Sequence, residues 1–280
     1  MSNIEVVKAD GSRQPFKVEK LRRSLRRSGA TREEVREVVA YIEARIYSGI
    51  STQEIYRAAF DKLKTQEFPA AARYSLRRAL FNLGPTGFPF EVFLGKLFAA
   101  EGYTSKNNLI IPGRCVEHEI DLAAYKDDHS FVAEAKFHSR AGVKSDLQVA
   151  LYCYARFLDL KKQRVCAEDI CGIDEFRLIT NTKFTKTAEK YAQCVGLPLL
   201  SWDYPRRDNL HDKIQRHGIY PITILQNLNN RETAILFESG VITCKDLLAN
   251  LSILKTLHLS TAKRARITEE VNSLHLSKTN

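Results

Sequence analysis

Residues 117–138 read EHEIDLAAYKDDHSFVAEAKFH, in which two largely apolar segments flank the polar stretch 126–129. Apolar and polar residues alternate in HEIDLAAY and SFVAEAKF, which predicts two β-strands joined as a hairpin. Four charged residues nevertheless stand inside these strands: Glu119, Asp121, Glu134 and Lys136. A charged group inside a sheet costs free energy unless it is paired, hydrogen-bonded or bound to a metal, so the four residues need an explanation.

The register of the hairpin decides which of these residues meet. A hairpin that pairs Tyr125 with Ser130 sets Asp121 opposite Glu134, and it sets the other two charged residues opposite each other. Strand alternation then places all four on one face of the sheet. The other face takes the neighbouring apolar residues Ile120, Leu122, Ala133 and Ala135.

Two facing carboxylates predict a bound cation. Opposed Cβ atoms lie roughly 5 Å apart, so Asp121 and Glu134 would repel each other without a cation or proton between them. Oxygen ligands completed by water suit Mg²⁺, which can activate a water molecule and offset charge on a phosphoryl group. Lys136 would then orient that water or stabilise the developing charge. The alternative is an exposed hairpin whose Glu and Lys side chains form ordinary cross-strand salt bridges.

The segments around the hairpin predict an α/β domain over residues 85–221. A helix over 90–103 carries Glu91, a strand over 108–112 follows, and a helix over 145–160 carries Gln148. A strand at 176–182, a helix at 185–196 and a strand at 197–203 complete the order. This order predicts a mixed central sheet flanked by helices.

Residues 88–203 resemble the PD-(D/E)xK nuclease superfamily, and within it the Mrr-like restriction endonucleases. The match rests on Asp121, on the sequence AEAKF with its ExK pair, and on the order of helices and strands. Ile120 departs from the family pattern, because it replaces the proline of the motif, and HEIDL replaces a glycine-rich segment. The resemblance implies Mg²⁺-dependent hydrolysis of DNA, with Asp121 and Glu134 as metal ligands. It implies catalytic roles for Glu91, Asp121, Glu134, Lys136 and Gln148.

Further polar residues near the hairpin are candidates for secondary roles. His138 is a candidate for proton transfer or phosphate contact, whereas His118 is expected to be structural. Three basic residues could contact the phosphate backbone or simply be solvated: Arg140, Lys144 and Arg156.

The first 84 residues predict a small domain of a hairpin followed by helices. IEVVKADGSRQPF has a turn at Asp10-Gly11 between apolar residues, and helical patterns follow at 18–29, 31–47, 51–65 and 69–82. NLGPTGFPF, residues 82–90, is rich in Gly and Pro and predicts a linker. The pattern V-x-K-x-D-G, Phe16 and Lys20-Leu21 resembles the ATP-cone, a regulatory nucleotide-binding module of ribonucleotide reductases and their repressors.

The ATP-cone resemblance implies a regulatory site for ATP or dATP. Lys8 at the hairpin and Lys20 at a helix start could converge on phosphates, and Val6 and Leu21 could line the base pocket. Ala9 stands where the family commonly has Arg. The alternatives are that the lysines are solvated surface residues, or that this basic domain binds DNA by itself.

Residues 222–280 predict a small helical domain. LFESGVITCKDLLAN and LHLSTAKRARITEEV resemble a helix-hairpin-helix or related DNA-binding module, in which a Gly-containing turn offers amides to phosphates. Lys263, Arg264 and Arg266 could form a phosphate-binding patch or the solvated face of a helix. A bundle that packs on the nuclease or forms a dimer interface is the alternative.

Composition and charge limit the classes of function. The net charge of the 280 residues is +10. Residues 1–85 hold 17 Lys and Arg against 10 Asp and Glu, a net +7, which suits a polyanionic partner. The six cysteines lack CxxC spacing, no segment has the length and apolarity of a membrane span, and the N-terminus lacks a signal peptide, so we expect a cytoplasmic protein.

The expectation from sequence is an α/β protein of three domains, at 1–84, 85–221 and 222–280. It predicts a Mg²⁺-dependent DNA endonuclease regulated by ATP or dATP, which by analogy serves host defence or DNA repair. Cutting two strands requires two sites, so a homodimer is expected. The alternatives are a non-catalytic nucleotide-sensing DNA-binding or scaffold protein, and an RNase or junction-specific nuclease.

Overall fold

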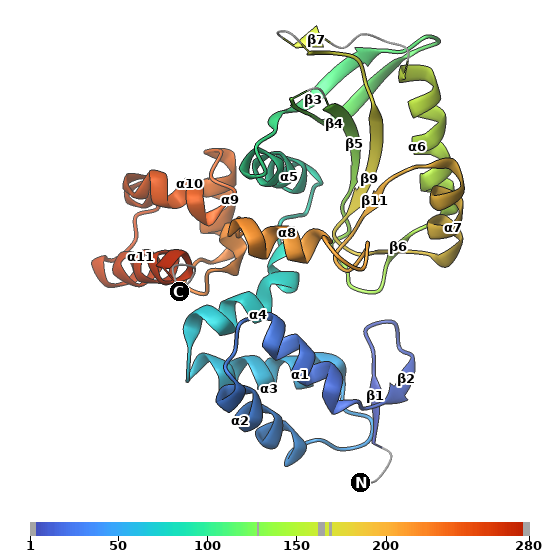
Figure 1. Cartoon of the computed structure of the whole chain (residues 1–280). Helices are drawn as coiled ribbons and strands as arrows, with labels where there is room; N and C mark the ends of the chain where they lie inside the picture. The colour runs from blue at the N-terminus through green and yellow to red at the C-terminus, as the bar shows by residue number, and fades with distance from the viewer. Residues whose placement is uncertain (1–3, 128, 162–165, 168–169, 277–280) are drawn as a thin grey trace. The chain divides into compact units, whose positions relative to one another are not determined.

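The computed structural model describes residues 4–127, 129–161, 166–167 and 170–276 (Figure 1). The chain forms two compact units. The first joins residues 1–79, 222–239 and 246–280, and the second joins residues 80–221 and 240–245. The predicted α/β class is confirmed, with a small hairpin-and-helix segment first, a mixed sheet in the middle and helices at the end.

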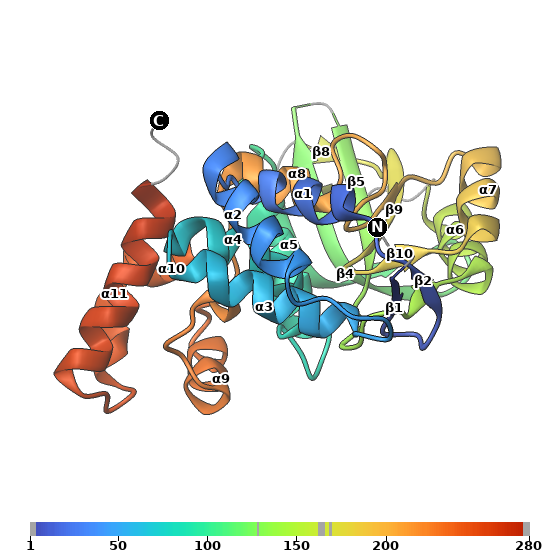
Figure 2. The ribbon, with the colours of Figure 1, turned by 90° about the horizontal axis from the view of Figure 1, so that it is seen from below.

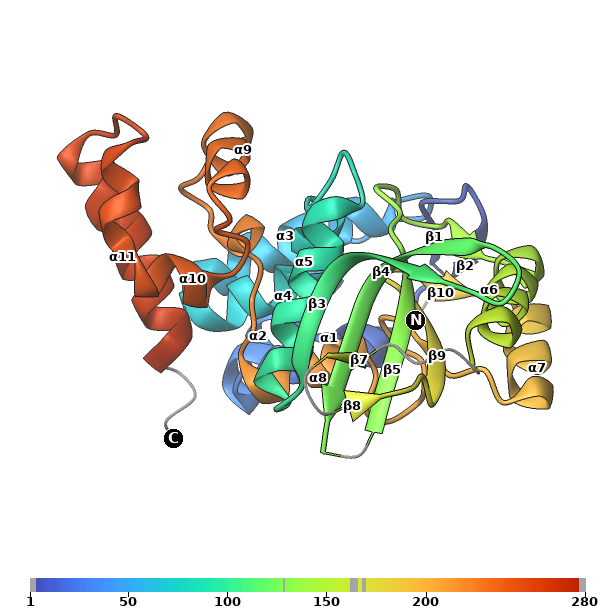
Figure 3. The same ribbon diagram turned by 90° about the horizontal axis from the view of Figure 1, so that it is seen from above.

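The second unit is built on a five-stranded mixed sheet with the strand order β11-β9-β5-β4-β3. Figure 3 labels four of these strands, β3, β4, β5 and β9. β4 pairs antiparallel with both β3 and β5, whereas β9 pairs parallel with β5 and β11 pairs parallel with β9. The bounds are Thr104–Pro112 for β3, Glu117–Lys126 for β4, His129–Lys136 for β5, Glu175–Thr180 for β9 and Leu199–Leu200 for β11.

Helices cover both faces of this sheet, because the central strands β4, β5 and β9 have buried apolar residues on both sides. The helix α5, Phe88–Ala100, packs on one face, where the ring of Phe98 lies 4.9 Å from that of Phe131. On the other face α6, Leu147–Leu160, and α7, Lys186–Val195, share a core cluster with Val132. A sheet buried on both sides needs such near-continuous apolar strands.

Two features of this unit differ from the sequence expectation. The predicted linker 82–90 is shorter than expected, because α5 begins at Phe88 with Pro89 in its first turn, a position that tolerates proline. The helix α8, Leu210–His217, was not predicted, because its eight residues contain only two buried apolar side chains, Leu210 and Ile214. Short two-stranded pairs join β6, Lys144–Ser145, to β10, Lys183–Phe184, and β7, Cys166–Ala167, to β8, Ile170–Cys171.

The N-terminal segment of the first unit is a hairpin followed by four helices (Figure 2). Thr31 and Ser51 each cap the helix that follows with a complete capping box, which explains why both starts could be read from the sequence. The bounds are Glu5–Val7 for β1, Arg13–Pro15 for β2, Val18–Arg27 for α1, Arg32–Glu43 for α2, Thr52–Lys64 for α3 and Phe68–Phe81 for α4.

The C-terminal segment is helical, as predicted. Asn229 caps α9 with a capping box, and its partner Glu232 also accepts hydrogen bonds from Lys263 on α11. The bounds are Ile222–Ile224 for η1, Asn230–Glu238 for α9, Cys244–Ala249 for α10, Leu251–Lys255 for η2 and Thr261–Leu276 for α11. Among the residues that the structure describes, no helix has both the length and the apolarity needed to cross a membrane.

Candidate active site

The predicted hairpin register is confirmed where β4 and β5 pair. Tyr125 pairs with Ser130, and the ladder runs to the pair Leu122–Ala133. The main-chain pairs expected beyond that point were wrong, because β4 and β5 part there and β5 continues beside β9, where Lys136 pairs with Thr180. A side chain connects the two strands beyond the last main-chain pair, because the carboxylate of Asp121 accepts a hydrogen bond of 2.6 Å from the backbone amide of Ala135.

The regular alternation of β4 also breaks at Asp121. Asn108, which stands across from it on β3, has a φ of 53°, and no ladder pair joins Asn108 to Asp121. The side-chain amide of Asn107 donates a hydrogen bond of 2.9 Å to the main-chain oxygen of Asp121. Ile120 and Ala123 consequently belong to the same core cluster, although they are three residues apart. The prediction that Ile120 shares the face opposite the charged residues is therefore wrong.

Three carboxylates gather where the strands part. The pKa of Glu91, on α5, is raised to about 7. Burial is the largest cause, and the nearby charges of Asp121, Glu134 and Glu119 add to it. Burial and the charge of Glu134 raise the pKa of Asp121 to about 6, although the Ala135 amide and Arg156 act in the opposite direction. The structure thus brings the predicted acids together, and in the absence of a cation they repel each other.

The raised pKa of Glu91 predicts a pH-dependent effect of Glu91→Gln on stability. The carboxyl group favours its neutral form in the folded state, so the wild type loses stability as the pH rises from about 4.5 to about 7. Above pH 7 the uncharged variant should be more stable by about 1 kcal/mol, a value reduced for the solvent screening of a half-buried group. Thermal unfolding in EDTA at pH 8 and pH 4.5 measures this difference.

The matched control is Glu117→Gln, which removes the charge of an exposed residue at the start of β4. It should change the unfolding temperature by less than the Glu91 variant at pH 8. An equal gain at pH 4.5 and pH 8 would contradict the electrostatic explanation, because the wild-type carboxyl group is largely neutral at the lower pH.

Arg156 on α6 holds Glu134 through an ion pair. The guanidinium forms an ion pair with Glu134 and also donates to the main-chain oxygen of Glu119. Arg156 is buried, with 5 % of its side chain exposed, and it lies 5.6 Å from the ring centre of Phe176. The prediction that Arg156 contacts the phosphate backbone is therefore wrong. Arg140 and Lys144 lie exposed in the loop and short strand after β5, and their suggested role stays a prediction.

The remaining site residues lie around the carboxylates with different degrees of exposure. Lys136 is exposed at the end of β5. The pKa of His138 is lowered, first by the burial of its own side chain and second by the charge of Lys136. The Nε2 atom of His138 lies 3.2 Å from the hydroxyl of Ser145. Gln148 lies in the first turn of α6, where its backbone amide bonds Asp146 and its side chain is exposed. No hydrogen bond joins the Gln148 side chain to the three acids within the described part of the chain.

His118 has the structural role expected of it. Its Nε2 atom lies 2.8 Å from the carboxylate of Asp159 at the end of α6, and both side chains are mostly buried. The same carboxylate accepts hydrogen bonds from the amides of Cys115 and Val116, so it fastens the turn between β3 and β4 to α6.

Two of the predicted acids, Asp121 and Glu134, match the ligand preferences of Mg²⁺. Among the residues that the structure describes, no three His, Cys, Asp or Glu side chains are gathered closely enough to hold a metal by themselves. Mg²⁺ is commonly held by one or two carboxylates and keeps several waters, so Asp121 and Glu134 suffice in number and chemistry. Arg156 supplies the positive charge beside Glu134 that a cation would otherwise provide.

The predicted nucleotide residues lie at the β1–β2 hairpin and the start of α1. Val6 and Leu21 are buried in the same apolar cluster, with 2 % and 7 % exposure. Lys8 and Lys20 are exposed, and the Nζ atom of Lys20 lies 3.5 Å from the side-chain oxygen of Gln14. The two lysines are accessible to phosphates, whereas the two apolar residues contribute chiefly to the core.

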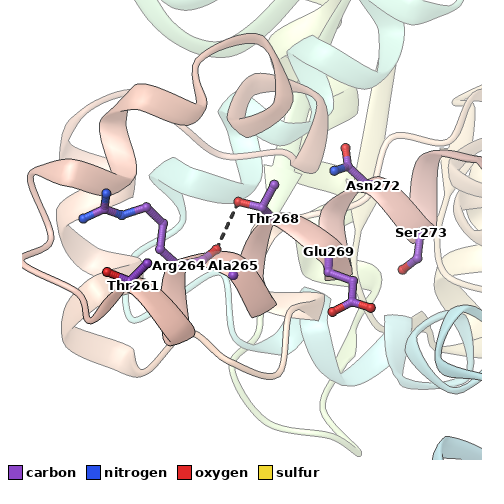
Figure 4. A pocket seen from close by; sticks show the side chains of 7 residues that line it. All are labelled: Thr261, Arg264, Ala265, Thr268, Glu269, Asn272 and Ser273. Atoms are coloured by element: carbon purple, nitrogen blue, oxygen red, sulfur yellow. Dashed lines mark hydrogen bonds between the residues drawn. The ribbon is translucent and has the colours of Figure 1, made fainter.

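The basic residues of α11 do not gather into one patch. Lys263 is occupied by Glu232, at 2.6 Å. Arg264 instead lines a groove whose lining also contains the acidic Glu269 (Figure 4). The other residues along this groove are Thr261, Ala265, Thr268, Asn272 and Ser273, all on the same helix. The groove has no excess of positive charge, so phosphate binding at α11 stays a prediction.

Comparisons with known proteins identify two segments and two relatives. Residues 4–81 match the ATP cone domain, which confirms the resemblance of the N-terminal segment to the ATP-cone, and residues 220–275 match a domain described as AF1548-like, C-terminal. An uncharacterized protein of Archaeoglobus fulgidus is 37% identical over 174 residues, which cover 62% of this chain and 94% of that protein. The crystal structure of the protein of unknown function AF1548 is similar with a TM-score of 0.56 and 33% identity, covering 68% of this chain and 98% of that one.

Proposed function

The chain belongs to the AF1548-like family and carries an ATP-cone domain at residues 4–81. We propose that it is a Mg²⁺-dependent DNA endonuclease regulated by nucleotide. The ATP-cone indicates nucleotide regulation of the protein. The family itself leaves the regulated activity open, so the proposal of a nuclease depends on the chemistry of the central sheet.

One observation carries the nuclease proposal: where β4 and β5 part, three acids lie near enough for their charges to raise the pKa values of two of them. Glu91 and Asp121 have raised pKa values, of about 7 and about 6, and Glu134 contributes to both shifts. Perturbed carboxylates that share a site are characteristic of functional positions. A divalent cation bound between Asp121 and Glu134 would remove this repulsion, which gives the arrangement a purpose that ordinary salt bridges do not.

Each residue then has a role that follows from its position. Asp121, fixed by the Ala135 amide, and Glu134 would hold the ion, which supplies an activated water and offsets charge on the phosphoryl group. Lys136 is exposed and positively charged, so it can orient the water or contact the scissile phosphate. Glu91, with a pKa of about 7, can accept or donate a proton near neutral pH. Gln148, exposed on the first turn of α6, could contact the same substrate.

The regulatory ligand of the ATP-cone is expected to be ATP or dATP. Lys8 and Lys20 are exposed at the hairpin and at the start of α1, where two cations can bind a row of phosphates. Cleavage of both strands of a duplex requires two active sites, so we expect the active species to be a homodimer.

The proposal is tested by incubating the protein with plasmid DNA in Mg²⁺ or in EDTA, each with and without ATP. We expect the protein to cleave DNA in Mg²⁺ and not in EDTA, and we expect ATP to change the rate of cleavage. The Lys136→Ala variant should lose most of this activity. A parallel panel of single-stranded RNA and branched DNA decides between a DNA endonuclease and an RNase or junction-specific nuclease. Cleavage that persists in EDTA would contradict the metal-dependent mechanism.

A non-catalytic nucleotide-sensing DNA-binding protein is the second candidate, and one observation favours it. Arg156 already neutralises Glu134 by a buried ion pair, so Glu134 does not require a metal to be stable in the fold. In this case DNA would bind without being cut in Mg²⁺, and binding would respond to nucleotide. The retention of Asp121 and Lys136 beside Glu134 is then unexplained, which is why we place the nuclease first.

A further inference from the structure

A cleft lined by arginines lies between α1 and α2, which pack side by side (Figure 1, Figure 2). Its volume is about 220 Å³. Its lining consists of four arginines, one acid and three apolar residues: Arg22, Arg26, Arg32, Arg36, Glu43, Val35, Val39 and Ala40. Four guanidinium groups that line one small space repel one another, and a bound anion would relieve this repulsion.

The four arginines form two rows that face the same space. Arg22 and Arg26 are one turn apart on α1, and Arg32 and Arg36 are one turn apart on α2, so each pair spans about 6 Å along its helix. Two of the four are only partly neutralised by exposed acids of their own helices, through the pairs Arg22–Glu19 and Arg36–Glu33. Within the described residues, Arg26 and Arg32 have no ion-pair partner.

The position of Arg32 adds an independent indication that the cleft binds an anion. Arg32 is the first residue of α2, where the helix dipole is positive and a cation is unfavourable. By contrast, the acids Glu33 and Glu34 lie in the first turn of α2, where negative charge interacts favourably with the helix dipole. An anion in the cleft would interact favourably with both the arginine and the helix start.

The lining selects phosphates and not nucleosides. It contains no aromatic ring on which a base could stack, and no amide or hydroxyl side chain that could read a base edge. The buried floor of Val35 and Val39 offers only apolar contact, whereas the forked arginines match phosphate oxygens in pairs. Neither Lys8 nor Lys20 lines the cleft, so it is distinct from the predicted nucleotide site.

We propose that this arginine cleft binds the phosphate backbone of DNA without regard to base sequence. The inference goes beyond the nuclease proposal, because it concerns a contact on the ATP-cone domain that requires neither a metal nor a reactive site. The ATP-cone domain then has two ligands: a nucleotide at the hairpin and a nucleic-acid backbone at the cleft. Residues 1–85, with their net charge of +7, provide the surrounding positive field.

The test is DNA binding in EDTA, where cleavage cannot contribute. Fluorescence anisotropy with a labelled 30-base-pair duplex compares the wild type with Arg26→Gln/Arg32→Gln over a range of salt concentrations. We expect binding at about 0.1 M salt to weaken roughly tenfold, and the salt dependence to become shallower by about two units of log–log slope, because two phosphate contacts are lost. The double variant Arg23→Gln/Arg57→Gln removes the same charge from exposed helix positions outside the cleft and should change affinity less than threefold.

Several outcomes would overturn the proposal. Equal weakening by the two double variants would show that only net charge matters, and unchanged binding by Arg26→Gln/Arg32→Gln would show that the cleft is not used. A third outcome is that the wild type binds tripolyphosphate tightly, while Arg26→Gln/Arg32→Gln loses this binding but still binds the duplex normally. This outcome would assign the cleft to a free oligophosphate. Thermal unfolding of each variant establishes that it is folded. Because EDTA removes the metal, a failure here leaves the nuclease proposal untouched.

Discussion

Substitution of Asp121 by Asn should reduce Mg²⁺-dependent DNA cleavage by at least about 1,000-fold, which corresponds to roughly 4 kcal/mol of transition-state stabilisation. The reason is that the amide is a neutral and weaker ligand, so the metal loses one of its two proposed carboxylates. The rate of conversion of supercoiled to linear plasmid, measured at saturating enzyme, checks the expected loss.

The structure indicates that this variant keeps its fold. Asp121 accepts a hydrogen bond from the Ala135 amide, and the side-chain oxygen of Asn can accept the same bond. The wild-type carboxylate is also destabilised by burial and by Glu134, which raise its pKa to about 6. Removal of the charge should therefore leave the metal-free protein at least as stable above pH 7 as the wild type. A large loss of activity then cannot be attributed to unfolding.

Asp127→Asn is the matched control for this prediction. Asp127 is exposed at the end of the same hairpin with a φ of 52°, a conformation that Asn tolerates well. This variant makes the same chemical change away from the acids and should cleave at the wild-type rate. If Asp121→Asn retains wild-type cleavage, the activity belongs to another site or to a contaminant, and the assignment of Asp121 fails.

The sequence was most informative where one local rule determines one local structure. The period-two pattern of 118–125 and 130–137 predicted the register in which Tyr125 pairs with Ser130, because one face of a buried strand must be apolar. The helical patterns at 31–47 and 51–65 predicted two helices, and their starts are fixed locally, because Thr31 and Ser51 each form a capping box within four residues. Such signals do not depend on distant parts of the chain.

The sequence was least informative where distant segments meet. Nothing in the pattern around Arg156 indicated that its guanidinium reaches Glu134, which lies 22 residues earlier on another element. The same holds for the break of alternation at Asp121, which depends on the left-handed conformation of Asn108 on the neighbouring strand. One signal was available in retrospect: Arg156 lies on the face of α6 that also carries the buried Cys153 and Leu160, where an exposed arginine is not expected.

Residues expected to bind ligands can also prove to be core residues. Val6 and Leu21 were predicted to line a base pocket, and both are buried in the apolar cluster of the N-terminal segment. An apolar residue next to a lysine fits either role on sequence alone. The arginine cleft was missed for a related reason, since four arginines spaced along two helices read as a solvated face until the helices are seen to face each other.

Arg156→Met should destabilise the metal-free protein by about 3 kcal/mol, because it leaves the mostly buried Glu134 without its counter-charge. Urea unfolding at pH 7.5 in EDTA measures this loss. The double variant Arg156→Met/Glu134→Gln should recover at least half of it, since the buried charge is then absent. Arg140→Met, in the exposed loop after β5, is the control and should change stability by less than about 0.5 kcal/mol.

The same variant separates the two proposed functions. If Glu134 is a metal ligand, Mg²⁺ should replace the missing guanidinium beside it, so several millimolar MgCl₂ should restore part of the stability of Arg156→Met while adding less to the double variant. If the acids belong to a non-catalytic scaffold, MgCl₂ should have equal and small effects on both proteins. A loss below 1 kcal/mol in EDTA would contradict the premise itself, because the ion pair between Arg156 and Glu134 would then contribute little to the stability of the fold.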